Sequence, residues 1–148
     1  MDTIVETYLK TGDAFTLIGK YSDTITDENY VEGAIRCVIA GQTILGQEHW
    51  DLVDQLWVYI VEGLVKLSRN EVYESSFPDQ PLLLRLEPVS DYCVKVTIGE
   101  KAYNVDRKAF ISVMKEGAVQ FFDAFKQLCP ASADTWDRYS NELKSIKP

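Results

Sequence analysis

The sequence predicts an α+β protein, with an antiparallel sheet of about five to six short strands, two long helices packed on one face of the sheet, and a short C-terminal helix. Three observations predict this class. Apolar residues alternate with a period of two in several short segments, they recur at steps of three and four in two long segments, and turns separate the segments. A length of 148 residues predicts one globular domain over residues 1–148.

The first half predicts three strands. Residues 14–20, with the sequence AFTLIGK, form a short apolar run, and a polar, acidic loop follows it. Residues 33–40 then alternate with a period of two, which is typical of a strand. The tripeptide Ala40-Gly41-Gln42 predicts a hairpin turn into a brief return strand at residues 43–45.

A long helix is predicted from Glu48 to about Arg69, because its apolar residues lie on one side of a helix. These residues are Trp50, Val53, Trp57, Ile60, Leu64 and Leu67. Gly63 lies inside the segment and weakens a helix by about 1 kcal/mol relative to alanine, so it predicts a close contact at that position.

The second half predicts three more strands, in LLLRLEPV (82–89), YCVKVTIG (92–99) and KAYNV (101–105). Asp106 is a good N-cap for a second long helix, and Pro130 ends that helix. A final helix follows, capped by Ser132 or Asp134. The predicted buried residues of these two helices are Phe110, Val113, Met114, Gly117, Phe121, Phe125, Leu128, Trp136, Tyr139, Leu143 and Ile146.

The negative charge of the chain is concentrated in its first half. Residues 1–76 contain 13 acidic and 5 basic side chains, so their net charge is 5 − 13 = −8, whereas residues 77–148 contain 10 of each and are neutral. Phosphate binding requires clustered Lys and Arg, so a nucleic acid is disfavoured as a ligand. A basic protein partner is favoured, because complementary charge accelerates encounter and fixes orientation.

Several classes of site have no support in the sequence. No apolar run reaches the ~18 residues that a membrane span requires, and no signal peptide is evident at the start, so a cytoplasmic location and no membrane partner are expected. Cys37, Cys93 and Cys129 form no CxxC pair and are interpreted as reduced core thiols. The glycines form no nucleotide-binding motif, and no cofactor is expected.

His49 is the single histidine and the first candidate for a catalytic base. No serine or cysteine can be placed beside it from spacing, so it is interpreted as an exposed residue near a helix N-terminus and no catalytic residue is predicted. The aromatic residues Trp50, Trp57, Phe121 and Phe122 are interpreted as core, with an aromatic ligand cage as the alternative.

Carboxylates are the candidate partner-binding residues. Those in the acidic loop could also suggest a metal site, but they lack the order of an EF-hand, and no metal ligand is assigned. In the segment FPDQP (77–81), two prolines stiffen an extended entry into a strand and leave two polar side chains for contact. The candidates are Asp23, Asp27, Glu28 and Glu32 in the loop, Asp51 and Asp54 on one face of the predicted helix, and Asp79 and Gln80 in FPDQP.

Most of residues 33–125 resembles a class of small bacterial cytosolic proteins that includes immunity proteins of polymorphic toxin systems. The segments that carry the resemblance are GAIRCVIAG, WDLVDQLWVYIVEGL, FPDQP and GAVQFFDAF. The resemblance implies a compact acidic inhibitor that occludes a toxin domain, commonly a basic nuclease. It assigns no binding residue.

The predicted function is therefore that of a non-catalytic acidic protein that binds a basic protein partner, with a toxin domain as the expected partner. An inhibitor of this kind needs only a complementary surface of ~800 Å² with a few dominant contacts. Two alternatives stay open from the sequence. One is an assembly or homodimerisation module, and the other is a small-ligand carrier with a pocket between sheet and helices.

Overall fold

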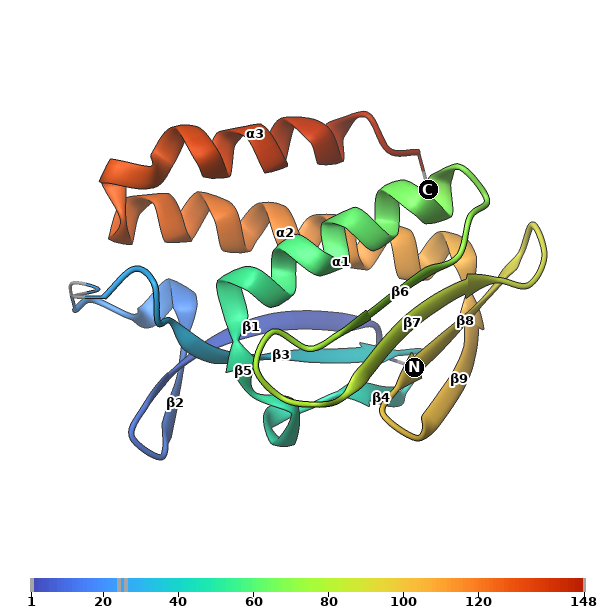
Figure 1. The fold of residues 1–148 in the computed structure, drawn as a ribbon, viewed down its shortest axis with the longest axis horizontal. Helices are drawn as coiled ribbons and strands as arrows, with labels where there is room; N and C mark the ends of the chain where they lie inside the picture. The colour runs from blue at the N-terminus through green and yellow to red at the C-terminus, as the bar shows by residue number, and fades with distance from the viewer. Residues whose placement is uncertain (1, 24, 26, 148) are drawn as a thin grey trace.

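The computed structural model describes residues 2–147 apart from residues 24 and 26, and it confirms the α+β class. The described strands divide between two antiparallel sheets, which the sequence pattern does not predict. Three α-helices lie on the same side of both sheets (Figure 1).

The first sheet is built mainly from the N-terminal third of the chain. Its strand order is β2-β1-β3-β4, and the two-residue strand β5 pairs with the beginning of β3. The predicted hairpin between β3 and β4 is confirmed. The predicted strand at 14–20 ends earlier than expected, because residues 18–20 form a 3₁₀ turn, η1. The strands are β1 Ile4–Thr11, β2 Ala14–Leu17, β3 Glu32–Ile39, β4 Gln42–Leu45 and β5 Asp51–Leu52.

Strand β1 lies in the middle of this sheet, although the sequence does not predict it. The residues of β1 that face the core are Val5, Thr7 and Leu9. Because Thr7 is polar, the sequence of this strand does not show a regular alternation of apolar and polar residues. Thr7 is only 5% exposed, and its Oγ1 accepts a hydrogen bond from Nε1 of Trp57 at 3.0 Å. A buried threonine paired with an indole N–H thus takes the place of an apolar residue.

The second sheet has the order β6-β7-β8-β9, with every neighbouring pair antiparallel. The three strands predicted in the second half correspond to β7, β8 and β9, and β6 is an additional edge strand. The FPDQP loop, Phe77–Pro81, connects β6 to β7. The strands are β6 Tyr73–Ser76, β7 Leu83–Pro88, β8 Cys93–Ile98 and β9 Lys101–Asp106.

The helices are α1 Val53–Ser68, α2 Arg107–Leu128 and α3 Ala133–Lys144. Helices α1 and α2 lie against the sheets, and α3 lies on the side of α1 and α2 that faces away from the sheets (Figure 1). The predicted N-cap of α2 is confirmed, because the Asp106 side chain accepts a hydrogen bond from the amide of Ala109 at 2.8 Å. A 3₁₀ turn at Pro130–Ser132, η3, separates α2 from α3.

Helix α1 begins later than the sequence predicts. Residues 47–49 form a 3₁₀ turn, η2, and Asp51 and Leu52 form β5, so the α-helix starts at Val53 instead of Glu48. Asp51 therefore does not share a helical face with Asp54. Trp50 is half-buried, whereas Trp57, Phe121 and Phe122 are completely buried, as predicted for core residues.

Gly63 in α1 permits close packing of the helix on the second sheet. A Cβ atom at this position would lie 2.6 Å from Cδ1 of Leu86 and 3.2 Å from Cδ2 of Tyr73. We expect Gly63→Ala to lower the free energy of unfolding by about 1 kcal/mol, because overpacking outweighs the gain in helix propensity. Urea denaturation measures this difference.

The matched control for Gly63→Ala is Ser112→Ala on the exposed face of α2. This substitution changes helix propensity without filling the core, and it is expected to stabilise by a few tenths of a kcal/mol, roughly the propensity difference. Equal stabilisation by both alanines would show that the contact at Gly63 has no energetic consequence.

Candidate functional site

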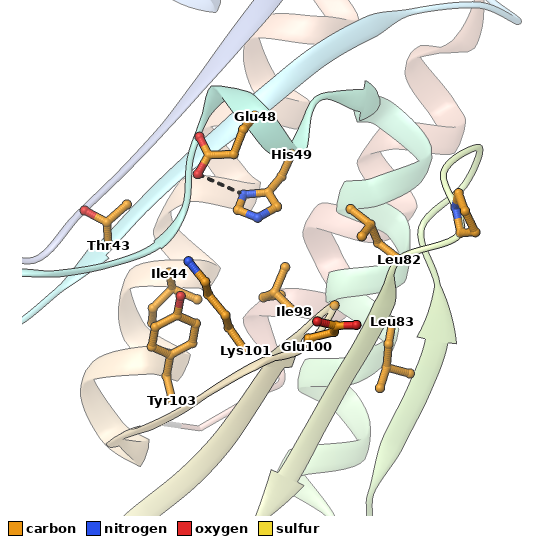
Figure 2. A pocket seen from close by; sticks show the side chains of 12 residues that line it. Thr43, Ile44, Glu48, His49, Leu82, Leu83, Ile98, Glu100, Lys101 and Tyr103 are labelled. Atoms are coloured by element: carbon orange, nitrogen blue, oxygen red, sulfur yellow. Dashed lines mark ion pairs between the residues drawn. The ribbon is translucent and has the colours of Figure 1, made fainter.

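A groove lies between the edge strand β4 of the first sheet and the β8–β9 hairpin of the second, with a volume of about 740 Å³. Its apolar lining includes Ile44, Leu82 and Ile98. Figure 2 shows Glu48 and His49 on the η2 side of the groove and Lys101 and Tyr103 opposite them. The groove thus combines an apolar surface with charged groups of both signs.

His49 is the one imidazole at this groove, and its side chain is 22% exposed, less than expected for the exposed residue that the sequence predicts. Its Nδ1 accepts a hydrogen bond from the Gly46 amide at 3.1 Å. Oε1 of Glu48 lies 3.7 Å from the same Nδ1, which is too long for a hydrogen bond. A nitrogen that accepts from Gly46 carries no proton, so the N–H donor of the ring is at Nε2.

The groove offers groups for binding. The described residues that line it include no serine or cysteine, and Thr43 contributes a hydroxyl. A nucleophile within hydrogen-bond reach of a base is the geometry that covalent catalysis requires. What the groove provides is the Nε2–H donor, the Lys101 ammonium and an apolar surface.

A second feature, which we name the acidic surface, adjoins the groove at Glu48. It consists of Asp27, Tyr30, Glu32, Glu48 and Asp79, which line two small hollows of about 130 Å³ each. Glu32 lines both hollows, and Glu48 lines one of them and also the groove. The structure therefore brings together three of the predicted residues, Asp27, Glu32 and Asp79, from segments far apart in the sequence.

Tyr30 and Glu48 are members of the acidic surface that the sequence reasoning did not single out. The Tyr30 side chain is 56% exposed, and its hydroxyl donates to Oε2 of Glu32 at 3.4 Å. The charge of Glu32, followed by partial burial and the charges of Asp79 and Asp51, raises the pKa of the Tyr30 hydroxyl. The sequence feature that could have indicated Tyr30 is a tyrosine beside acidic residues in a polar loop.

Asp51 was a candidate for partner contact, but it is only 1% exposed and holds the FPDQP loop in place. Its Oδ1 accepts from the amides of Leu52 at 2.6 Å and Asp79 at 2.9 Å, and its Oδ2 accepts from the amide of Gln80 at 3.0 Å. The Gln80 side-chain amide also donates to the carbonyl of Trp50. Asp51 therefore holds Asp79 of the acidic surface in position through the FPDQP loop, and its own carboxylate is not exposed to solvent.

Asp54 was also a candidate for partner contact, and it is only 6% exposed. Burial raises the pKa of its carboxyl, against the opposing effect of the backbone amide of Gln55. The remaining candidates, Asp23 and Glu28, are exposed in the loop before β3, and Glu28 accepts a hydrogen bond from Ser132 at 3.5 Å. Asp54 thus lies outside the exposed acidic surface.

One lysine approaches the acidic surface. Nζ of Lys10 lies 4.2 Å from the centre of the Trp50 ring, where a cation–π contact is favourable. Lys10 also lines the same hollow as Asp27 and Glu32. Its position reduces the local negative charge without pairing directly with a carboxylate in the described part of the chain.

The cysteines are free, as predicted, and two of them are buried. Burial raises the pKa of the Cys37 thiol to about 12, and burial together with the Glu28 carboxylate raises that of Cys129 to about 12. Within residues 2–147 without 24 and 26, no group of His, Cys, Asp and Glu is placed to hold a metal ion. None of the described helices combines the length and apolar character of a membrane span.

The two adjoining features, groove and acidic surface, form one continuous region of the molecule at Glu48. This region combines a cluster of carboxylates around an exposed tyrosine with an apolar groove beside it. The functional conclusion depends on these residues alone, because no protein-family model, no curated protein and no solved structure was found to match the chain.

Proposed function

We propose that the protein is a non-catalytic, cytoplasmic binding protein that occludes a basic protein partner through the acidic surface, as an immunity-like inhibitor of a toxin domain would. The observation that carries the proposal is the exposed Tyr30 among the carboxylates of Glu32 and Asp79. Tyrosine is enriched among the residues that dominate binding energy at interfaces. Carboxylates around it complement the lysines and arginines of a basic partner.

The charge distribution supports the same kind of partner. The first half of the chain carries a net charge of −8, from 5 basic and 13 acidic side chains, and the acidic surface consists largely of this half. A field of one sign steers a partner of the opposite sign during diffusion. A basic nuclease domain, whose active site accepts phosphates, is the toxin class that this charge fits best.

The FPDQP part of the acidic surface is held in place by hydrogen bonds before binding. Asp51 fixes the amides of Asp79 and Gln80, and the Phe77 amide donates to the Leu82 carbonyl at 2.8 Å across the base of the FPDQP loop. Phe77 is itself 3% exposed. Because the loop has little conformational freedom to lose, a partner pays a smaller entropic cost on binding.

The first experiment identifies the protein encoded immediately upstream and co-purifies its C-terminal domain with this chain. We expect the double charge reversal Glu32→Lys/Asp79→Lys to weaken binding to that domain by at least about tenfold, measured by calorimetry, because like charges then face the basic partner. Raising the salt concentration should weaken wild-type binding in the same direction.

The control is Glu116→Lys/Glu142→Lys, which changes the net charge equally but alters exposed residues on α2 and α3. It should bind nearly as tightly as wild type. If both double variants weakened binding equally, the change in net charge alone would explain the effect. The proposal that the acidic surface binds the partner would then be wrong. A stable homodimer that buries Tyr30 without any partner would also contradict the proposal.

The groove supports a second candidate function, the binding of a small molecule. Its volume of about 740 Å³ lies within the range of ligand sites, and His49 and Lys101 supply donors beside its apolar lining. A thermal-shift screen should then find an apolar anion that stabilises the wild type and not Lys101→Ala. A screen in which no anionic metabolite raises the unfolding temperature would exclude this candidate.

A further inference from the structure

A small slot lies between α1 and α3, and none of the residues that line it belongs to the acidic surface. Its volume is about 220 Å³, below the range of drug-sized ligands but sufficient for a small group. The residues that line it are Asp54, Gln55, Val58 and Tyr59 from α1, and Thr135, Trp136 and Tyr139 from α3.

The slot contains buried polar atoms that lack partners. Among the described residues, Oδ1 of Asp54 and Nε1 of Trp136 are buried without a hydrogen-bond partner. One is an acceptor and the other a donor, and both residues line the slot. Buried polar groups are nearly always paired, so an unpaired donor and an unpaired acceptor at one small cavity favour a ligand with polar or charged groups there.

The Asp54 carboxylate also lacks a compensating cation. Its pKa is raised by burial and lowered by backbone amides, and no lysine or arginine contributes to it. Lys126 pairs instead with Asp137 at 2.9 Å, and the Arg138 guanidinium lies over the Tyr139 ring, 5.2 Å from its centre. A water molecule could satisfy the hydrogen bonds of the slot, but it would leave only the backbone amides in the first turn of α1 to compensate the buried negative charge.

The aromatic rings of the slot are held in place by the core. The Trp136 ring stacks on Phe122 at 5.7 Å and meets the edge of Phe125 at 5.2 Å. Tyr139 stacks on Phe122 at 5.7 Å. Aromatic rings beside a carboxylate are the combination that recognises an organic ammonium ion, through cation–π attraction and charge pairing.

We propose that the slot between α1 and α3 binds a small organic ammonium ion, with its charged nitrogen beside Asp54 and its alkyl groups against Tyr59, Trp136 and Tyr139. The lining explains this choice, because a neutral apolar molecule would leave Asp54 unpaired and an anion would be repelled by it. The proposal is independent of the acidic surface and of its protein partner.

The test uses the full-length protein labelled with ¹⁵N, titrated with choline and with its neutral isostere 3,3-dimethylbutan-1-ol. Choline is expected to move the Trp136 indole N–H signal and the amide signals of the slot residues in a saturable manner. The isostere should bind at least about tenfold more weakly, because it cannot pair with the carboxylate.

Asp54→Asn keeps the shape of the side chain and removes its charge, so choline should bind it at least about tenfold more weakly than wild type. The matched control is Glu62→Gln, an exposed residue of the same helix that does not line the slot, and its affinity should be unchanged. A second variant, Trp136→Leu, should also lose affinity while retaining the helical circular dichroism signal.

Four results would overturn the proposal. Three of them are equal binding of choline and its neutral isostere, undiminished binding to Asp54→Asn, and no saturable movement of the Trp136 signal. The fourth is tighter binding of Nα-acetyl-lysine methylamide than of choline. This result would show that the slot prefers a lysine side chain of a protein to a free ammonium ion.

Discussion

Asp51→Ala is expected to lower the free energy of unfolding by about 3 to 5 kcal/mol, the largest loss that we predict for a single polar side chain here. The carboxylate is 1% exposed and accepts hydrogen bonds from three backbone amides. Alanine would leave those partly buried amides without their acceptor. Guanidinium denaturation at neutral pH measures the loss.

The same substitution should release the FPDQP loop before the rest of the protein unfolds. The amides of Asp79 and Gln80 are bonded to Asp51, so their hydrogen exchange should be slow in wild type and fast in Asp51→Ala. Amides in the middle of α2 should keep most of their protection under native conditions. Binding of the basic partner should weaken as well, because Asp79 would lose its fixed position.

Two further variants show whether the effect belongs to the acceptor role of Asp51. Asp51→Asn keeps one carbonyl oxygen but turns an NH₂ group toward a backbone donor, so its loss should be intermediate. Asp91→Ala removes an exposed carboxylate from the β7–β8 turn and should change stability by less than about 0.5 kcal/mol. A loss in Asp51→Ala as small as in Asp91→Ala would contradict the assigned role.

Asp51 illustrates why part of the candidate site could not be predicted from the sequence. Its partner Asp79 lies 28 residues further along the chain, and no local pattern connects the two. The spacing of Asp51 and Asp54 was therefore interpreted as a helical face, whereas Asp51 forms part of β5. The prolines of FPDQP correctly predicted a stiff entry into β7, but not the residue that holds it.

Local signals predicted the elements that depend on local chemistry. Asp106 and Pro130 bound helix α2 closely, and the turn at Ala40 and Gly41 joins β3 to β4. Strand β1 was missed because its buried Thr7 is satisfied by Trp57, a residue 50 positions away. Tertiary contacts likewise bring Tyr30 and Glu48 close to Asp79. The sequence could therefore suggest candidate carboxylates, but it could not show which of them share one surface.

Asp54→Asn is expected to raise the free energy of unfolding by about 1 to 3 kcal/mol at neutral pH, opposite in sign to Asp51→Ala. The two carboxylates are both buried, but Oδ1 of Asp54 has no hydrogen-bond partner among the described residues. Asparagine removes the buried charge and keeps the shape of the side chain. Denaturation across a range of pH measures the gain.

The gain should depend on pH in a direction set by the raised pKa of Asp54. Between the ordinary pKa of the unfolded carboxyl, 3.8, and the higher folded value, the native state binds more protons than the unfolded state. The wild type therefore loses stability as the pH rises through this window. Asp54→Asn should match the wild type below the window and exceed it above.

The groups near Asp54 do not alter this sign. Cys129, whose thiol interacts with both Asp54 and Glu28, has a pKa of about 12 and stays neutral across the window. Tyr59 and Tyr139 also line the slot. If Asp54→Asn were equally or less stable than wild type at neutral pH, the carboxylate would have to be paired in solution. Native mass spectrometry of the purified protein would then show whether a bound cation had been retained.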